Sequence, residues 1–111
     1  MAYSISYYSE SVQADILGLP VGILADYLRL TDLLEEFGPS LRMPHSRAMG
    51  DGLFELRPKG REGIGRVFYC YLIGQRIVVL HSFIKKTQET PRRELKIATA
   101  RMHEVNHAHT R

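Results

Sequence analysis

The sequence has no tryptophan, a single cysteine and no long apolar run. A lone thiol cannot form an internal disulfide, so Cys70, which lies in an apolar stretch, is expected to pack in the core. No segment approaches the roughly 18 consecutive apolar residues of a membrane span, and the first ten residues lack the basic head of a signal peptide. We therefore expect a cytoplasmic protein.

Several catalytic motifs are also missing. The sequence has no glycine-rich phosphate loop, no nucleophile elbow and no paired-carboxylate motif. His103, His107 and His109 are spaced like metal ligands on a helix, but no cysteine or carboxylate completes a tetrahedral zinc set. We predict no metal site and no cofactor, which leaves any chemistry to arginine, lysine and single histidines.

What the sequence does have is an uneven distribution of charge. Residues 1–56 hold three basic and eight acidic side chains, whereas residues 57–111 hold twelve basic and four acidic ones. The two halves therefore carry net charges of −5 and +8. This polarity predicts one face that meets a polyanion such as a nucleic acid.

The hydrophobic pattern predicts a single α+β domain over residues 1–111, in the order strand, two helices, three strands, helix. The expected elements are a strand at 3–7, helices at about 9–17 and 20–37, strands at 53–57, 64–73 and 76–84, and a last helix that starts near Pro91. Residues 39–51 show no clear period and are expected to be a loop. We expect an antiparallel sheet of about four strands, with the two N-terminal helices packed on one face.

The dipeptide Gly74-Gln75 fits a two-residue type II′ turn, which sets the register of the last two strands. Residue 73 should then pair with 76, 68 with 81 and 66 with 83. One face mixes charged and apolar residues: Arg66, Phe68, Cys70, Leu72, Ile77, Val79, His81, Phe83 and Lys85. The other is almost wholly apolar and should lie under the helices: Val67, Tyr69, Tyr71, Val78, Leu80, Ser82 and Ile84. We expect the mixed face to be the functional site.

The mixed face suits cleavage of RNA without a metal, in which the 2′-hydroxyl attacks the adjacent phosphorus. Arg57 and Arg66 are candidates to clamp phosphate oxygens, and Lys85 adds a point charge. His81 is the candidate to transfer a proton. RNA-binding roles are expected for Lys59, Arg61, Phe68, Phe83 and Lys86, with the two phenylalanines as stacking surfaces for an unpaired base.

Each of these side chains also has a structural interpretation. Arg66 could form an ion pair with Glu55, and His81 could be a packed, hydrogen-bonded residue of a central strand. The pair Lys85-Lys86 could protect the end of a strand, and the lysine and arginine of the 59–61 turn could be solvated. The residues alone leave these alternatives open.

Five segments of the chain follow one another in a specific order and spacing. They are Gly38–Leu41, Gly52–Arg57, Gly63–Tyr69, Ile77–Thr87, and the helix from Thr90-Pro91 through Glu94, Ala98 and Arg101. In this arrangement the chain resembles the RelE/ParE toxin superfamily, and within it the HigB-like, phage-derived branch. The resemblance covers about residues 38–104.

This resemblance implies a small α+β fold, a toxin of a type II toxin–antitoxin pair, and metal-independent cleavage of messenger RNA in the ribosomal A site. Arg57, Arg66 and the Lys85-Lys86 pair match basic positions of the family's sheet. The acid and the base are not identified by the resemblance, because the chain departs from RelE at several of the relevant positions.

These departures concern the strand before the matched arginine and the last helix. Leu53 and Glu55 stand where RelE has lysines, and the last helix lacks the tyrosine that RelE uses there. His81, Lys59 or a C-terminal histidine would have to substitute as acid or base.

The implied partners are the ribosome, messenger RNA and a cognate antitoxin, a small HigA-like protein with a helix-turn-helix domain. An acidic amphipathic segment of that antitoxin would suit the basic face. The alternative function is that of a ParE-like, non-catalytic inhibitor of DNA gyrase, which has the same fold. A histidine on the basic face favours the nuclease, because an inhibitor that only binds needs no proton-transfer group.

Overall fold

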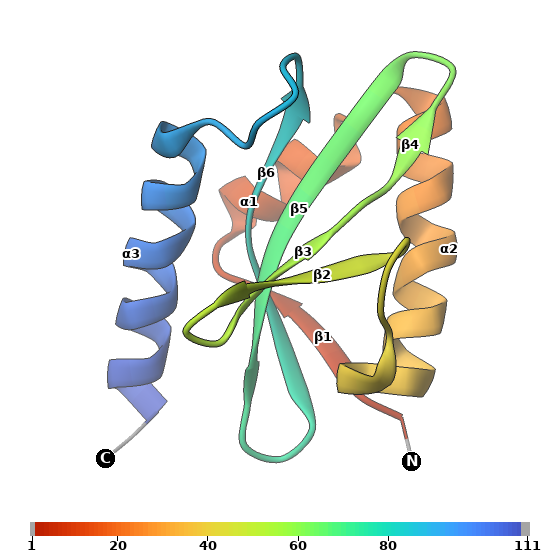
Figure 1. Ribbon diagram of the computed structural model, residues 1–111. Coiled ribbons are helices and arrows are strands. Elements are labelled where there is room, and N and C mark those ends of the chain that lie inside the picture. Colours follow the sequence, from red (N-terminus) through yellow and green to blue (C-terminus); the bar gives the residue numbers. More distant parts are fainter. Residues whose placement is uncertain (1, 110–111) are drawn as a thin grey trace.

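The computed structural model describes residues 2–109, without the side chain of His109 (Figure 1). The elements are β1 Ser4–Tyr7, α1 Glu10–Leu17, α2 Val21–Phe37, the 3-10 helix η1 Gly38–Ser40, β2 Ser46–Gly50, β3 Leu53–Leu56, β4 Lys59–Gly60, β5 Gly63–Leu72, β6 Arg76–Lys85 and α3 Arg92–His109. None of the described helices is long and apolar enough to cross a membrane.

The strands form a six-stranded sheet in the order β1-β6-β5-β3-β2, with β4 paired to β5. β1 runs parallel to β6, and the other pairs are antiparallel. The predicted α+β class is confirmed, but the sheet is mixed and has more strands than the four expected. Part of the expected loop at 39–51 is the edge strand β2, because it pairs with β3.

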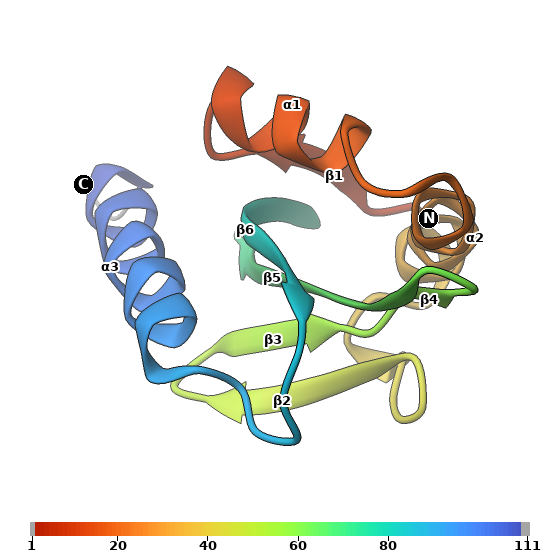
Figure 2. The same cartoon turned by 90° about the horizontal axis from the view of Figure 1, so that it is seen from above.

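Helices cover both faces of the sheet, with α1 and α2 on one side and α3 on the other (Figures 1 and 2). The first core consists of Val12, Ile16, Tyr27, Leu30, Leu34, Leu56, Val67, Tyr69, Ile77 and Val79. The second core lies beneath α3 and consists of Leu53, Phe68, Cys70, Val78, Leu80, Ala98 and Met102. Burial in this second core raises the pKa of the Cys70 thiol to about 11, as suits a packing residue.

The register between β5 and β6 agrees with the prediction at one end of the hairpin only. Arg66 pairs with Phe83, and position 68 with position 81, as predicted. Near the turn, however, Leu72 pairs with Arg76, and the register shifts between residues 68 and 69. The connection therefore has three residues, 73–75, and the predicted two-residue turn is wrong. Within this connection, Gly74 and Gln75 both have a positive φ.

This shift changes which side chains share a face. Ile77 and Val79 pack in the core with α1 and α2, whereas Val78 and Leu80 pack beneath α3. That is the reverse of the prediction, because a slip of one residue turns each side chain to the opposite face. Toward the turn, the predicted binding face is hydrophobic core, and its charged residues lie at the opposite end of the strands.

Two carboxylates attach the turn around β4 to helix α2. Asp26 accepts a hydrogen bond from the backbone N–H of Lys59 at 2.8 Å, and Glu62 accepts one from the N–H of Gly22 at 2.9 Å. The N-cap of α2 is Pro20, which makes no side-chain capping bond, so Glu62 satisfies a donor that the helix leaves free. These bonds fix the position of Lys59 relative to α2.

We predict that Glu62→Gln destabilises the fold at neutral pH but not in acid. The N–H of Gly22 lowers the pKa of the Glu62 carboxyl. The stability gained is therefore present at pH values above 4.5, the ordinary pKa of a glutamate. It is lost as the pH falls through the lower pKa of the folded state. Urea denaturation at about pH 7 and about pH 3 measures the difference.

Glu36→Gln, at an exposed position of α2, is the matched control and should behave like the wild type at both pH values. If the free energies of unfolding of wild type and Glu62→Gln differed as much in acid as at neutral pH, the result would contradict the charge effect.

Candidate functional site

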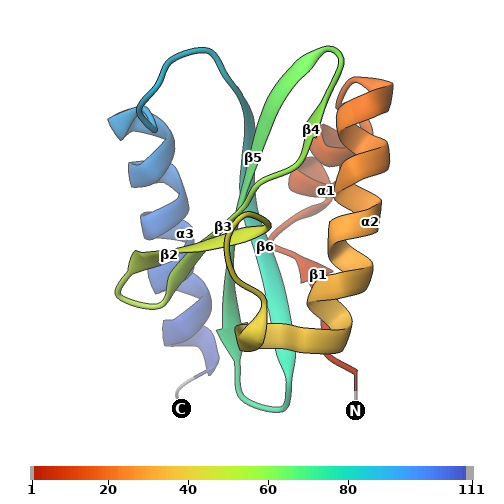
Figure 3. The ribbon, with the colours of Figure 1, turned by 45° about the vertical axis from the view of Figure 1, so that its right-hand side comes forward.

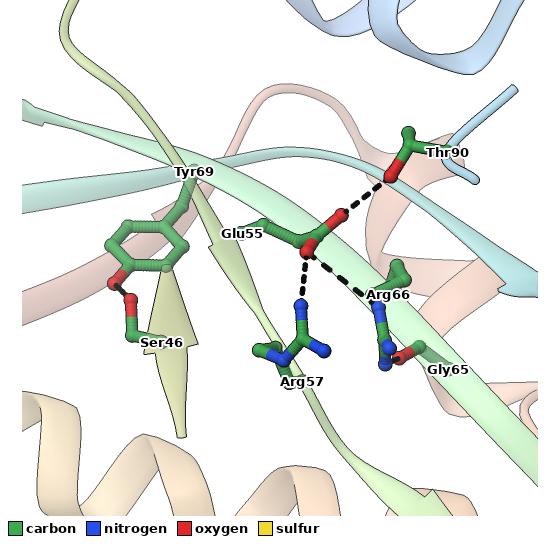
Figure 4. Close-up of polar contacts among 7 residues, drawn as sticks. All are labelled: Ser46, Glu55, Arg57, Gly65, Arg66, Tyr69 and Thr90. Carbon is green, nitrogen blue, oxygen red and sulfur yellow. Dashed lines mark hydrogen bonds and ion pairs between the residues drawn. The ribbon is translucent and has the colours of Figure 1, made fainter. Parts of the chain in front are cut away.

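A buried carboxylate lies at the charged end of the sheet (Figure 4). Glu55, in β3, is completely buried. Its Oε1 accepts a hydrogen bond from Arg57 Nη1 at 2.8 Å and lies 3.6 Å from Arg66 Nε. Its Oε2 accepts a hydrogen bond from the Thr90 hydroxyl at 3.1 Å. The ion pair between Arg66 and Glu55, one of the alternatives left open by the sequence, is therefore present.

The two arginines that share this carboxylate differ in exposure. Arg66 is only 5% exposed, and its Nη1 also donates to the carbonyl of Gly65 at 2.7 Å. Burial lowers the pKa of Arg66, and the charge of Arg57 acts in the same direction. Arginine nevertheless stays protonated at physiological pH. Two guanidinium charges thus face one carboxylate charge, which leaves an excess of positive charge.

Both arginines line a cavity of about 390 Å³, hereafter the basic pocket. Its lining comprises Asp26, Arg29, Leu30, Met43, Pro44, His45, Arg57, Lys59, Ile64 and Arg66. The single carboxylate among these, that of Asp26, already pairs with Arg29 at 2.9 Å and with the N–H of Lys59. The remaining cations make the pocket suitable for an anion such as a phosphate group.

Further positive charge lies beside the basic pocket. Arg47 stands opposite Glu55 in the β2–β3 pair. Partial burial lowers the pKa of Lys85, and the charges of Arg66, Arg57 and Arg47 contribute to the lowering. Lys85 pairs with Ile64, two residues from Arg66 in β5, and a bound anion would relieve the mutual repulsion of these cations.

Residues of the predicted face that lie farther along the strands are not part of this pocket. His81 Nε2 is hydrogen-bonded to Glu94 of α3 at 2.6 Å, and its ring stacks on Phe83. His81 is therefore packed and hydrogen-bonded, as in the structural interpretation given above.

Phe68 is completely buried beneath α3. It is not available to stack on a base, so the prediction of an RNA-binding role for this residue is wrong. The sequence pattern did not show that the last helix covers this part of the sheet. Phe83 is partly exposed, and its ring lies 5.8 Å from that of Phe68.

The other predicted RNA-binding residues lie around the basic pocket or near the strand ends. Lys59 lines the pocket, Arg61 is exposed in the turn between β4 and β5, and Lys86 is exposed directly after β6. Among the described residues no group of three metal-ligating side chains occurs. The side chain of His109, from the histidine triplet considered above, lies outside the described part.

His45 is a pocket residue that the sequence did not single out. It lies in the turn between η1 and β2, and its carbonyl accepts the backbone N–H of Arg57 at 3.0 Å. This bond joins the turn to the end of β3 and brings the histidine to the arginines. No spacing in the sequence relates His45 to Arg66, because the relation arises from the folding of the β2–β3 hairpin.

We predict that Glu55→Gln lowers the free energy of unfolding by about 3 kcal/mol, because the neutral amide leaves two buried or half-buried guanidiniums without their counter-charge. Urea denaturation measures the effect. Glu89→Gln, at an exposed loop position, should change stability by less than about 0.5 kcal/mol. A comparably small effect of Glu55→Gln would show that the carboxylate does not hold the arginines.

Comparison with solved structures shows the type of fold. The chain is similar to a chain of the archaeal RelE-RelB complex from Pyrococcus horikoshii OT3, with a TM-score of 0.54 and 23% sequence identity. The likeness covers 76% of this chain and 96% of that chain. No curated protein sequence matches the chain. At this level of identity the structural likeness establishes a RelE-like fold.

Comparison with protein families gives a match over most of the sequence. Residues 14–103 match the family described as Phage derived protein Gp49-like (DUF891). The matched range includes α2, all the strands except β1, and every residue that lines the basic pocket. This match agrees with the phage-derived branch that the sequence resembles, and the structural likeness agrees with the RelE-like fold that the resemblance implies. The chain therefore belongs to the phage-derived Gp49-like family, and it has a RelE-like fold.

Proposed function

We propose that the protein is the toxin of a type II toxin–antitoxin system, of the HigB-like branch, and that it cleaves messenger RNA on the ribosome. Membership of the phage-derived Gp49-like family, together with the RelE-like fold, supports the toxin role. The observation that carries the nuclease proposal is that Arg57, Arg66 and His45 line the same cavity. Neither the matching family nor the structural neighbour supports the alternative of a DNA gyrase inhibitor.

Arg57 and Arg66 are proposed to hold the phosphate that is attacked. Glu55 already holds both guanidiniums in place, so little reorganisation is needed when the substrate binds. Negative charge on the phosphate oxygens grows as the fifth oxygen joins phosphorus. Fixed cations therefore stabilise the transition state more than the ground state. Lys85, near these arginines, adds to this stabilisation.

His45 is proposed to transfer a proton. In the reaction a bond forms between the 2′-oxygen and phosphorus while the bond to the 5′-oxygen breaks, which yields a 2′,3′-cyclic phosphate and a 5′-hydroxyl. One proton leaves the 2′-hydroxyl and another reaches the 5′-oxygen. An imidazole, which titrates near neutral pH, suits either transfer. Because His81 is held by Glu94 outside the pocket, we assign this role to His45 instead.

An antitoxin is the proposed protein partner. The structural neighbour was solved as a RelE-RelB complex, and a HigA-like antitoxin with a helix-turn-helix domain would play the corresponding part here. An acidic segment placed over the basic pocket would neutralise its excess charge and block access of RNA. Release of that segment would expose Arg57 and Arg66 to the messenger on the ribosome.

The nuclease proposal is tested by primer extension on a reporter messenger RNA in a translating extract. We expect new 5′ ends inside the reading frame, and we expect them to disappear when initiation is blocked. The block matters because the ribosome is proposed to order the substrate for attack. Messenger that stays intact in the presence of the purified, folded protein would contradict the proposal.

Two histidine variants test the assignment within the site. His45→Ala should lower the cleavage rate at least about 100-fold, as the loss of a general acid or base does. His81→Ala, the matched control, should keep a rate close to that of the wild type if its fold is intact. Thermal unfolding of both variants checks this condition. Equal losses in two folded variants, or a loss only in His81→Ala, would contradict the role of His45.

A further inference from the structure

A hydroxyl of the segment between β6 and α3 contacts the buried carboxylate of the site. Figure 3 shows this segment leaving the end of β6 and crossing to the start of α3. Within it, Thr90 donates from Oγ1 to Glu55 Oε2 at 3.1 Å (Figure 4). The other oxygen of the carboxylate, Oε1, accepts a hydrogen bond from Arg57 Nη1 at 2.8 Å. Thr90 and Arg57 therefore hold the Glu55 carboxylate by its two oxygens.

The backbone that carries this hydroxyl is itself held in place. Pro91 follows Thr90 directly and restricts its backbone to extended conformations. The carbonyl of Pro91 accepts the N–H groups of Glu94 and Leu95, at 3.1 and 3.2 Å, in the first turn of α3. Leu95 packs against the core beneath that helix. The Thr90 hydroxyl is therefore presented from a fixed point rather than from a loose loop.

Arg66, by contrast, makes only a distant contact with Glu55. Its Nε lies 3.6 Å from Glu55 Oε1, which is too far for a hydrogen bond. This buried nitrogen has no hydrogen-bond partner among the residues that the structure describes. A buried donor without an acceptor is unfavourable, so the carboxylate and Arg66 Nε would approach each other if nothing opposed it. The bonds from Thr90 and Arg57 oppose that approach.

The distance between Arg66 and Glu55 sets how much positive charge Arg66 offers to the basic pocket. A guanidinium that bonds directly to a carboxylate has its charge neutralised locally and some of its donors occupied. At the observed distance, more of the charge of Arg66 acts on the pocket that it lines. The terminal torsion of a glutamate is soft. Without the Thr90 hydroxyl, the Glu55 carboxylate would be free to turn toward Arg66.

We propose that Thr90 is a positioning residue whose hydroxyl keeps the Glu55 carboxylate from closing on Arg66. Arg66 then remains able to bind an anionic group, the phosphate of the substrate, in the basic pocket. With respect to RNA the proposal rests on the proposed function. Thr90 does not belong to the lining of the basic pocket, so its effect passes through Glu55.

The test compares two substitutions that differ in the hydroxyl. Thr90→Val keeps the branched shape of the side chain and removes the donor, whereas Thr90→Ser keeps the donor. NMR signals of the arginine Nε–H groups report directly on a hydrogen bond between Arg66 and Glu55. In Thr90→Val the Arg66 Nε–H proton should move downfield as this bond forms. In Thr90→Ser it should stay at the wild-type position.

Inorganic phosphate measures the effect on the basic pocket in the absence of RNA. Thr90→Val should bind phosphate about 10-fold more weakly than the wild type, which corresponds to the loss of about one charged hydrogen bond. Thr90→Ser should stay within about twofold of the wild type. Thr87→Val is the matched control, because it removes a hydroxyl of the same segment that bonds to the carbonyl of Glu89 instead. Its phosphate affinity should equal that of the wild type.

Three outcomes would overturn the proposal, and the first needs no variant. An Arg66 Nε–H signal that is already far downfield in the wild type would show that the bond to Glu55 exists there. An unchanged phosphate affinity in Thr90→Val, with folding checked by thermal unfolding, would show that the hydroxyl has no effect on the pocket. An equal loss of affinity in Thr90→Ser would show that the effect does not depend on the hydroxyl.

The cleavage assay separates this proposal from the nuclease. Thr90→Val should cleave messenger about 10-fold more slowly than the wild type, and Thr90→Ser should restore the rate. Intact messenger with the wild type would reject the nuclease, while the NMR signals and the phosphate affinities would still decide the role of Thr90. Slower cleavage by Thr90→Val without a change in those two measurements would reject the positioning role and leave the nuclease standing.

Discussion

The charged end of the molecule depends on one buried carboxylate. Glu55 lies in β3, between β2 and β5, and joins arginines from the end of its own strand and from β5 to a hydroxyl from the segment before α3. Without that negative charge, the guanidiniums of Arg57 and Arg66 would repel each other at low dielectric. Glu55 does not itself line the basic pocket. Glu55 thus fixes the positions of two arginines of the pocket without itself being exposed to a ligand there.

The position of α3 divides one face of the sheet into a core and a site. The helix begins at Arg92, beyond the charged end of β6, and its buried residues pack over Phe68, Cys70 and their neighbours toward the hairpin turn. His81 lies on the same face and is bonded to the helix through Glu94. The same strand face therefore serves as hydrophobic interior in one half and presents Arg66 and Lys85 in the other.

The segment from Arg42 to Ser46 positions His45 in the basic pocket. The backbone N–H groups of His45 and Ser46 both donate to the carbonyl of Arg42, and the carbonyl of His45 accepts the N–H of Arg57. These backbone bonds hold the turn against the end of β3, which brings His45 to the arginines.

The sequence by itself determined the α+β class and the bounds of the helix that ends at Phe37. The predicted pairing of Arg66 with Phe83 also occurs, but only because the register shift between residues 68 and 69 offsets the additional residue in the turn. Periodicity and glycine or proline signals act between near neighbours in the chain, so they can be read without a structure. It also placed Lys85 on the same face as Arg66.

Only the tertiary structure decided the length of the hairpin turn, the burial of Phe68 and the place of His45 in the site. The glycine in the turn supplies positive φ for a two- or a three-residue connection, and a one-residue difference reverses the faces of the strand. Burial under α3 and the approach of His45 to Arg57 depend on contacts between distant segments. Local patterns do not carry that information, because the packing of the whole chain sets those contacts.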